Sequence, residues 1–221
     1  MRSLVLSTAA FTLLALTSCI TINGSHKRAR GPIEERIITL NEAATALAIS
    51  DGINVVVDSG LAANEVKVIT HSDIIDGIKV EVVDSSLNIS RTSCKLHAET
   101  LIVRVPAFDY DTLAISGGSD LNWTACTVPS LTIAISSGAD ADIMGNCNFL
   151  TVAASAGADV DCDELYAEEV NVAASAGADV SVYASKAITV VASSGADVSY
   201  AGNPAVKQIT TSSGADVEIA D

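Results

Sequence analysis

One short pattern dominates the second half of this sequence and restricts what the chain can fold into. A heptapeptide with a central glycine and an aspartate two residues later occurs six times, twice verbatim as ASAGADV at residues 154–160 and 174–180. The intervals between successive central glycines are 20, 19, 20, 18 and 19 residues. These glycines are Gly118, Gly138, Gly157, Gly177, Gly195 and Gly214. A fixed period of this length is typical of a solenoid, in which each repeat forms one rung of a coil.

Within each repeat, apolar and polar residues alternate with a period of two. Around Gly157, the odd positions are apolar or small (Val152, Ala154, Ala158 and Val160), and most even positions in the repeats carry Ser, Thr, Asp or Asn. This alternation predicts strands with one inward and one outward face, bent at the glycine. The rest of each period shows no helical stripe. We therefore predict an all-β protein, a parallel β-helix or solenoid whose rungs of about 19 residues stack at about 4.8 Å.

The N-terminal half contains fainter copies of the pattern. The segment AISDGINVVV places Gly52 at the glycine position and Asn54 at the aspartate position, and VVDSSLNIS places Ser86 and Asn88 there. We predict that residues 33–110 form an irregular β-rich module with degenerate rungs, and that residues 111–221 form the regular coil. The coil ends in GADVEIAD, almost on a rung, with little sequence left over for a cap. That edge is either blunted by acidic residues or paired with another protomer in a homo-oligomer.

The first residues indicate the location of the protein in the cell rather than its fold. Residues 1–18 have the features of a lipoprotein signal peptide, with a positive Arg2 and an apolar run too short to span a membrane. The run ends in LTSC, which resembles the bacterial lipobox, so we expect Cys19 to become the acylated, palmitate-bearing start of the mature chain. An ordinary cleaved signal peptide is the alternative. Ile20, rather than an aspartate, follows Cys19 and favours the outer membrane, on either its periplasmic or its surface face.

Residues 19–32 are predicted to form the lipid anchor and a polar tether. The tether contains Lys27, Arg28 and Arg30, which either contact anionic headgroups at roughly 1 kcal/mol per charge or are simply solvated. The whole chain has a formal net charge of −15, which makes nucleic acid an improbable partner. Its aromatic content of 4% suits thin, closely stacked β layers better than a core of large rings.

The aspartates of the repeats are the first candidate functional residues. If the rungs stack in register, six outward carboxylates form one column: Asp120, Asp140, Asp159, Asp179, Asp197 and Asp216. We expect each of them to close an Asx-type turn by accepting a backbone N–H near the glycine. Calcium binding between successive rungs is the less favoured alternative, and no other cofactor is expected. A second outward column, of serines two residues before each glycine, is expected to lie beside the aspartates. Together the two columns would form one stripe of hydroxyls and carboxylates that either binds a glycan or is only solvated.

Catalytic motifs are weak in this sequence. Polysaccharide-active β-helix enzymes need carboxylates with Arg or Lys on one face, but only Lys186 and Lys207 follow Arg104. The three histidines are isolated from any nucleophile or metal-ligand spacing. We therefore expect a protein without catalytic activity.

Four cysteines remain in a compartment that permits disulfides. Cys126 lies eight residues after Gly118 and Cys147 nine residues after Gly138, so we predict a disulfide between these two. Cys162 occupies an inward position and is expected to pack as a small apolar residue. Cys94 is the alternative partner for Cys126.

The strand DGINVVVDSG, the serial SGAD turns and the lipobox together resemble the head GIN domain family of auto-transporter adhesins, which is frequent in Bacteroidetes. The resemblance covers roughly residues 33–221 and implies a β-helical fold in the cell envelope, with no catalytic residues. The expected function is that of a lipid-anchored, adhesin-like binding protein, with a glycan or a surface protein as partner. A polysaccharide-active enzyme and a purely structural envelope scaffold are the alternatives.

Overall fold

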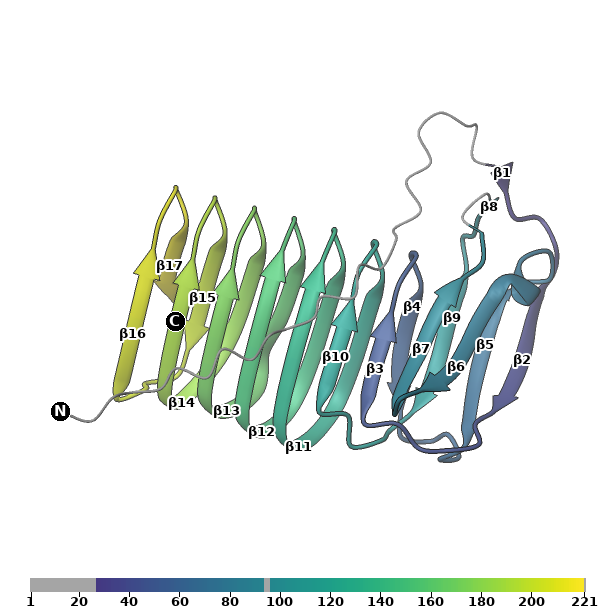
Figure 1. Ribbon diagram of the computed structural model, residues 1–221, viewed down its shortest axis with the longest axis horizontal. Coiled ribbons are helices and arrows are strands. Elements are labelled where there is room, and N and C mark those ends of the chain that lie inside the picture. Colours follow the sequence, from purple (N-terminus) through teal and green to yellow (C-terminus); the bar gives the residue numbers. More distant parts are fainter. Residues whose placement is uncertain (1–26, 94–95, 221) are drawn as a thin grey trace.

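The computed structural model describes residues 27–93 and 96–220 of the chain, which form an elongated β-solenoid (Figure 1). Strands stack side by side along the longest axis, with β16 and β17 at one end and β2 at the other. The predicted fold class is confirmed. Within the described ranges the helical structure is a single 3-10 turn, Ile75–Gly77, and no helix is long and apolar enough to cross a bilayer.

The regular coil is a parallel stack in which every rung has an arm before the corner and an arm after it. Its strands are β10 (Thr112–Ile115), β11 (Asp120–Ser136), β12 (Asp140–Ser155), β13 (Asp159–Ala174), β14 (Asp179–Ala192), β15 (Asp197–Ala201), β16 (Val206–Thr211) and β17 (Asp216–Ile219). The long strands run from one corner, around the opposite bend, to the next corner. The repeating glycines are therefore the corners, as the sequence predicts.

The core lies between the two arms and consists of stacked ladders of aliphatic residues. One ladder contains Leu113, Ile133, Val152, Val172 and Val190, which are paired in register across consecutive rungs and are at most 3% exposed. Each such side chain contributes about 1.5–3 kcal/mol when it is fully buried. The two-residue alternation therefore stabilises the coil in proportion to the number of stacked rungs.

Each corner consists of two consecutive residues in the left-handed region. At one corner these are Ala176 (φ 54°) and Gly177 (φ 68°), and the same pair of conformations recurs at every rung. A Cβ added to Gly177 would meet no atom within 4 Å, so glycine is required there for its conformation rather than for space. The alanine that follows, Ala178, is fully buried, so small size matters at that position instead.

The first fainter copy in the N-terminal module is a true rung. Strands β3 (Ala46–Ile49) and β4 (Asn54–Asp58) flank a corner at Asp51 and Gly52, and they pair in parallel with β10 and β11. Its next neighbour in the coil has Ser119 where the later rungs have alanine. The buried Ser119 hydroxyl accepts the backbone N–H groups of Gly52 (3.1 Å) and Ile53 (3.2 Å), which joins the module to the coil.

The second fainter copy was wrongly predicted as a rung. Strands β6 (Ile78–Val83) and β7 (Ser86–Arg91) form an antiparallel hairpin, with Asp84 and Ser85 in left-handed conformations at its turn. In β7, Asn88 pairs with Ala48, four residues before a corner glycine, and not with the residues that follow the corner. A two-residue hairpin turn and a rung corner use the same pair of left-handed residues, so their local sequences look alike.

The remaining strands close the N-terminal end. Strand β2 (Ile33–Thr39) is antiparallel to β5 (Glu65–His71), β5 is antiparallel to β9 (Leu101–Pro106), and β9 is parallel to β4. Strand β1 (Lys27–Arg28) pairs with β8 (Leu96–His97). The folded body therefore begins within the segment predicted as tether, because residues 27–32 are already attached to it. Cys19 and the signal peptide lie outside the described residues.

The last rung carries a polar cap that the sequence reasoning missed. In β16, Lys207 takes the inward position that Ile188 occupies in β14, and its ammonium lies 5.6 Å from the centre of the Tyr200 ring. Ile209 on the same strand is 43% exposed, whereas its counterpart Val190 is fully buried. An inward-pointing charge discourages pairing of an open sheet edge. Lys207 therefore adds a charge at this edge to the outward acidic residues that the sequence predicts there.

The predicted disulfide is absent, because Cys126 and Cys147 are free, buried thiols. A bulge shifts the register, so Cys126 lies opposite Gly145 and Cys147 lies opposite Val128. Two residues of offset across adjacent strands place the two Cα atoms about 8 Å apart, beyond the range that a disulfide bridges. Cys162 is fully buried, as expected, and Cys94 lies outside the described residues.

We expect the three buried thiols to resist alkylation in the folded protein. Burial raises the pKa of Cys126 to about 12 and of Cys147 to about 11, and it also raises the pKa of Cys162, so little reactive thiolate forms at pH 8. Peptide mapping after iodoacetamide treatment should find these residues unmodified in buffer and fully modified in urea. A disulfide-linked peptide pair under non-reducing conditions would contradict this structure.

We also expect Ala176→Gly to stabilise the coil. A left-handed alanine carries about 1 kcal/mol of backbone strain, which glycine removes. Glycine also loses more conformational entropy on folding than alanine does, so the net gain in the free energy of unfolding is a few tenths of a kcal/mol. The control Ala173→Gly changes an equally exposed alanine in a strand and should lower stability by about 0.5–1 kcal/mol. Urea midpoints measure both changes, and a lower midpoint for Ala176→Gly would contradict the corner geometry.

Candidate functional site

The structure brings the six predicted aspartates into one column. Each pairs with its counterpart in the next rung, and Asn54 of the first rung extends the column at its N-terminal end. The column comprises Asn54, Asp120, Asp140, Asp159, Asp179, Asp197 and Asp216. It lies on the arm that follows the corner, and we call the outward surface of this arm the acidic face.

A second polar column runs beside the first, two residues further along each strand. It comprises Asn122, Asp142, Asp161, Ser181, Ser199 and Glu218. Asn122 Nδ2 donates to Asp142 Oδ2 at 3.1 Å, and the hydroxyls of Ser181 and Ser199 are 2.9 Å apart. Sequence reasoning did not single out these residues, although their even spacing from the glycines is the same kind of signal that identified the first column.

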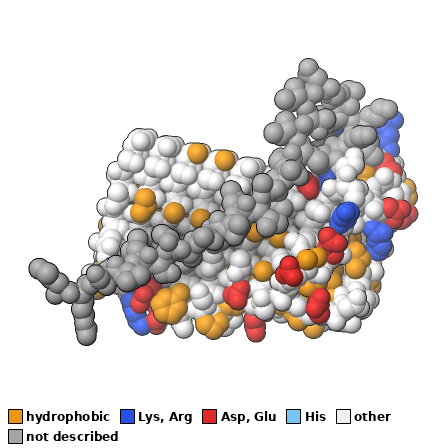
Figure 2. Space-filling model, viewed as in Figure 1, with side chains coloured by type: hydrophobic (Ala, Val, Ile, Leu, Met, Phe, Trp, Pro, Cys, Tyr) orange, Lys and Arg blue, Asp and Glu red, His pale blue; other side chains and the backbone are white. Residues whose placement is uncertain are grey.

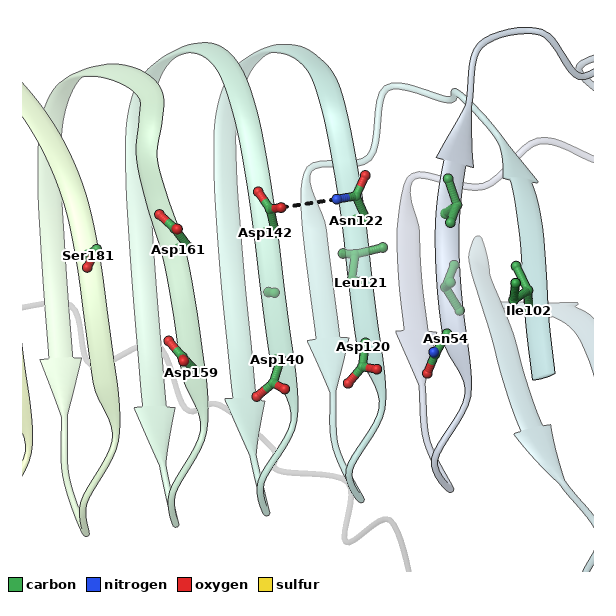
Figure 3. A pocket seen from close by; sticks show the side chains of 13 residues that line it. Asn54, Ile102, Asp120, Leu121, Asn122, Asp140, Asp142, Asp159, Asp161 and Ser181 are labelled. Atoms are coloured by element: carbon green, nitrogen blue, oxygen red, sulfur yellow. Dashed lines mark hydrogen bonds between the residues drawn. The ribbon is translucent and has the colours of Figure 1, made fainter. Parts of the chain in front are cut away.

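An open groove of about 680 Å³ crosses the acidic face where the two columns meet the N-terminal module (Figure 3). Carboxylates of three successive rungs, including Asp120, Asp140 and Asp159, project from its long side. Ile102 of β9 and Val56 of β4 contribute an apolar wall at its N-terminal side. A smaller groove of about 360 Å³ continues along the columns toward the last rung. The site is therefore elongated, largely acidic, and apolar at one end.

Two carboxylates of the first column, Asp120 and Asp159, have raised pKa values. Partial burial and the neighbouring charge of Asp140 raise the pKa of Asp120. Partial burial, followed by the charges of Asp140, Asp179 and Asp161, raises the pKa of Asp159. Asp58, at the end of β4, shows the opposite effect: the Gly60 N–H and the Arg104 guanidinium, 2.9 Å away, lower its pKa.

The aspartates of the first column do not form the predicted Asx turns. The N–H of each corner glycine is used between rungs, as in the 3.1 Å bond from Gly157 to the carbonyl of Ala176. Where a column carboxylate does accept a backbone N–H, it is that of its own following residue, as Asp216 does from Val217 at 2.9 Å. Backbone bonds link the corners from Gly118 to Gly195, and the Ser119 hydroxyl serves at the Gly52 corner. The column carboxylates do not close these corners, so most of their oxygens remain available to a partner.

The predicted serine column is confirmed in register but lies on the opposite side of the molecule. The serines precede the corner and the aspartates follow it, and the core separates the two arms. The serines share their surface with uncharged columns such as Thr132, Thr151 and Asn171. The two columns therefore do not form one stripe: the protein has an acidic face and a neutral face.

No three His, Cys, Asp or Glu side chains gather into a metal site in residues 27–93 and 96–220. The one histidine whose side chain is described, His71, places Nδ1 2.7 Å from the carbonyl of Gly31 at the N-terminal end, away from the groove. The groove is lined by neither Lys nor Arg. The groove lining thus offers carboxylates, amides and hydroxyls for recognition. Arg104 lies opposite Val56 in the sheet, just beyond the lining, and is paired with Asp58.

The comparisons with known proteins agree on the fold. The chain matches the family described as "Putative auto-transporter adhesin, head GIN domain" over residues 44–204. It is similar to the solved structure of a "putative adhesin" from Bacteroides fragilis, with 11% identity and a TM-score of 0.72, over 87% of this chain and 99% of that one. It is also similar to a "Putative lipid binding protein" from Parabacteroides distasonis, with 12% identity and a TM-score of 0.51, over 88% and 99% of the two chains. No curated protein sequence matches it.

We expect Asp140→Asn to stabilise the protein. The substitution removes a charge that opposes ionisation of Asp120 and Asp159, and carboxylates one rung apart repel by about 0.9 kcal/mol in water, so a gain of about 0.5 kcal/mol is expected. Because these two groups bind protons more readily in the folded state, wild-type stability should rise as the pH falls from 7 toward their ordinary pKa of 3.8. Urea unfolding at pH 7 and pH 5 measures both effects.

Asp58→Asn is the matched control for that prediction. It removes a carboxylate whose lowered pKa reports favourable contacts, so it should reduce stability at pH 7. Equal effects of the two substitutions, or a stability of the wild-type protein that falls between pH 7 and pH 5, would show that the column is not under repulsion.

Proposed function

Because the chain belongs to the head GIN domain family, we propose that it is an adhesin-like protein of the cell envelope that binds its partner through the acidic face and is held to the membrane by an acylated Cys19. The family description and the adhesin name of the Bacteroides fragilis structure support the coarser part of this proposal, a surface interaction protein. The acidic face and the lipobox support the finer part.

The observation that carries the proposal is the groove with its two columns. Polar groups recur at every rung, about 4.8 Å apart, along a rigid parallel sheet. A partner that repeats along its own length, such as a glycan or an extended segment of a surface protein, can make the same contact at successive rungs. Contacts of this kind add through multivalency even where each is weak. The carboxylates favour partners that bring hydroxyl or cationic groups.

The apolar wall marks one end of the repeating surface, at which a bound partner can align. Ile102 lies opposite Asn54, and Val56 lies opposite Asn122, where the columns meet the N-terminal module. Apolar surface next to a few convergent polar groups is the usual composition of a ligand site. A partner with one apolar element would therefore align at this end of the groove and extend along the carboxylates.

A polysaccharide-active enzyme is the second candidate, and one observation favours it. Asp120 and Asp159 have raised pKa values and both neighbour Asp140, as in pairs of carboxylates that act as acid and base. Against it, every rung presents the same pair, so no pair is singled out. The groove is also open to solvent and has no Lys or Arg to stabilise a developing charge. The proposed role therefore involves no catalysis and no cofactor.

The test is binding of the purified protein to arrays of glycans and immobilised surface proteins, with Ca²⁺ and with a chelator. We expect saturable binding that Asp140→Asn/Asp159→Asn weakens about tenfold, which corresponds to about 1.4 kcal/mol. The control Glu34→Gln/Glu81→Gln removes the same charge from exposed positions outside the groove and should leave binding unchanged. The predicted independence from calcium requires equal binding in both buffers.

Three outcomes would overturn parts of this proposal. Absence of binding across the arrays would leave a structural scaffold as the better description. Release of shorter sugars from a bound polysaccharide would establish the enzyme. An N-terminal peptide with an unmodified Cys19, found by mass spectrometry of the protein from its native membrane, would remove the lipid anchor.

A further inference from the structure

Charge is distributed unevenly along the axis of the solenoid. Residues 27–110 contain nine Lys and Arg against twelve Asp and Glu, whereas residues 111–221 contain two against fifteen. Four ion pairs lie within the N-terminal module: Arg28–Glu99, Arg36–Asp76, Lys67–Glu35 and Arg104–Asp58. On the face drawn in Figure 2, blue side chains gather at the end where β2 lies, and another group lies near the far end. The module is close to neutral, and the coil carries most of the net negative charge.

The N-terminal end also exposes groups that suit a lipid surface. The outward face of β2 includes Ile33, which is 55% exposed, and Ile37, which is 58% exposed. The Arg28 side chain is 72% exposed, and Arg30 is exposed beside it. Pairing of β1 with β8, and the bond from the Arg30 backbone N–H to Asp73 (3.0 Å), fix this basic segment to the body. Exposed isoleucines next to arginines are found on surfaces that rest on membranes. Glu34 and Glu35 are also exposed on β2, and Glu35 is paired with Lys67, so the charges of this end nearly balance.

The length of the tether limits where the anchor can be. Residues 20–26 separate Cys19 from β1, so even a fully extended chain keeps the start of β1 within about 28 Å of the anchored cysteine. The sheet from β2 to β17 contains ten strands in series, which gives an axis of about 43 Å. The anchor therefore holds the N-terminal end near the lipid, while the last rung can lie either near the membrane or far from it.

We propose that the protein stands on an anionic lipid bilayer, with its N-terminal end (β1, β2 and the turn after β6) against the lipid and its acidic coil directed away. This inference rests on the proposed acylation of Cys19. If the coil lay flat, its carboxylates would come within the Debye length of the headgroups, about 8 Å at physiological ionic strength, and would be repelled. The nearly neutral end meets no such repulsion. The upright position presents the acidic groove and the last rung to partners outside the membrane.

The test measures the height of two labels above the bilayer. The full-length lipidated protein, in a Cys94→Ser background, is labelled at Glu81→Cys or at Ser212→Cys, both exposed positions, and placed in phosphatidylglycerol nanodiscs with an acceptor dye on the headgroups. Because the two sites lie near opposite ends of the axis, energy transfer should be at least about threefold greater from position 81 than from position 212.

Charge variants test the cause of this orientation. Removing three coil charges (Asp140→Asn, Asp159→Asn and Asp179→Asn), or adding 1 M NaCl, which shortens the Debye length to about 3 Å, should raise transfer from position 212 about twofold. The matched control removes three exposed charges that lie outside both the aspartate column and the proposed contact surface (Glu42→Gln, Asp109→Asn and Asp111→Asn) and should leave that transfer unchanged.

The possible failures can be told apart. Equal transfer from both positions in protein whose Cys19 is shown to be acylated would overturn the orientation and leave the anchor intact. Equal sensitivity to both sets of charge variants would overturn the electrostatic cause. An unmodified Cys19 would overturn the anchor, and the orientation with it.

Discussion

The structure depends on the register between rungs, which backbone hydrogen bonds maintain even through the corners. Gly157 donates to Ala176 of the next rung, and Asp159 donates to Ala139 of the previous one. Two left-handed residues reverse the chain within this ladder without interrupting it. On both sides of each corner, residues therefore face their equivalents one period away, whereas bulges shift the register at the opposite bend. The buried valine ladders and the exposed aspartate column are two consequences of the same alignment, one stabilising and the other repulsive.

The protein limits the repulsion that this alignment creates. The column nearest the corner is aspartate in all six regular rungs, but the column beside it contains amide, carboxylate and hydroxyl side chains. Asn122 donates to Asp142, and Ser181 and Ser199 replace carboxylates in the later rungs. Uncharged residues thus separate part of the acidic face into segments, and the largest excess of carboxylates remains around Asp140, Asp159 and Asp161. This is the region that the larger groove occupies.

The sequence predicts the parts of the structure that repeat with the interval between the glycines. It does not predict contacts that depend on local geometry or that occur only once along the coil. The six corners, the core ladders and the aspartate column follow from an interval of 18 to 20 residues. The hairpin at Asp84 and Ser85 was mistaken for a corner because both turns need the same backbone conformations. The offset of Cys126 from Cys147 arises from an extra residue in β11 between Trp123 and Cys126, which places Cys126 opposite Gly145. A side chain at Gly145 would collide with the Cys126 carbonyl. Lys207 interrupts an inward apolar column, and this interruption is a sequence signal that could have identified it.

The division into two faces determines how such a protein can be selective. The arm before each corner presents uncharged columns, and the arm after it presents carboxylates, so a partner that recognises charge can use only one side of the solenoid. Along that side the columns repeat, and repetition alone would let a polymer slide by one rung without losing contacts. The apolar wall of Ile102 and Val56 occurs at one end of the groove and breaks this equivalence. A partner that fills it must therefore bind in one register, whereas a partner that contacts only the carboxylates remains free to shift along the coil.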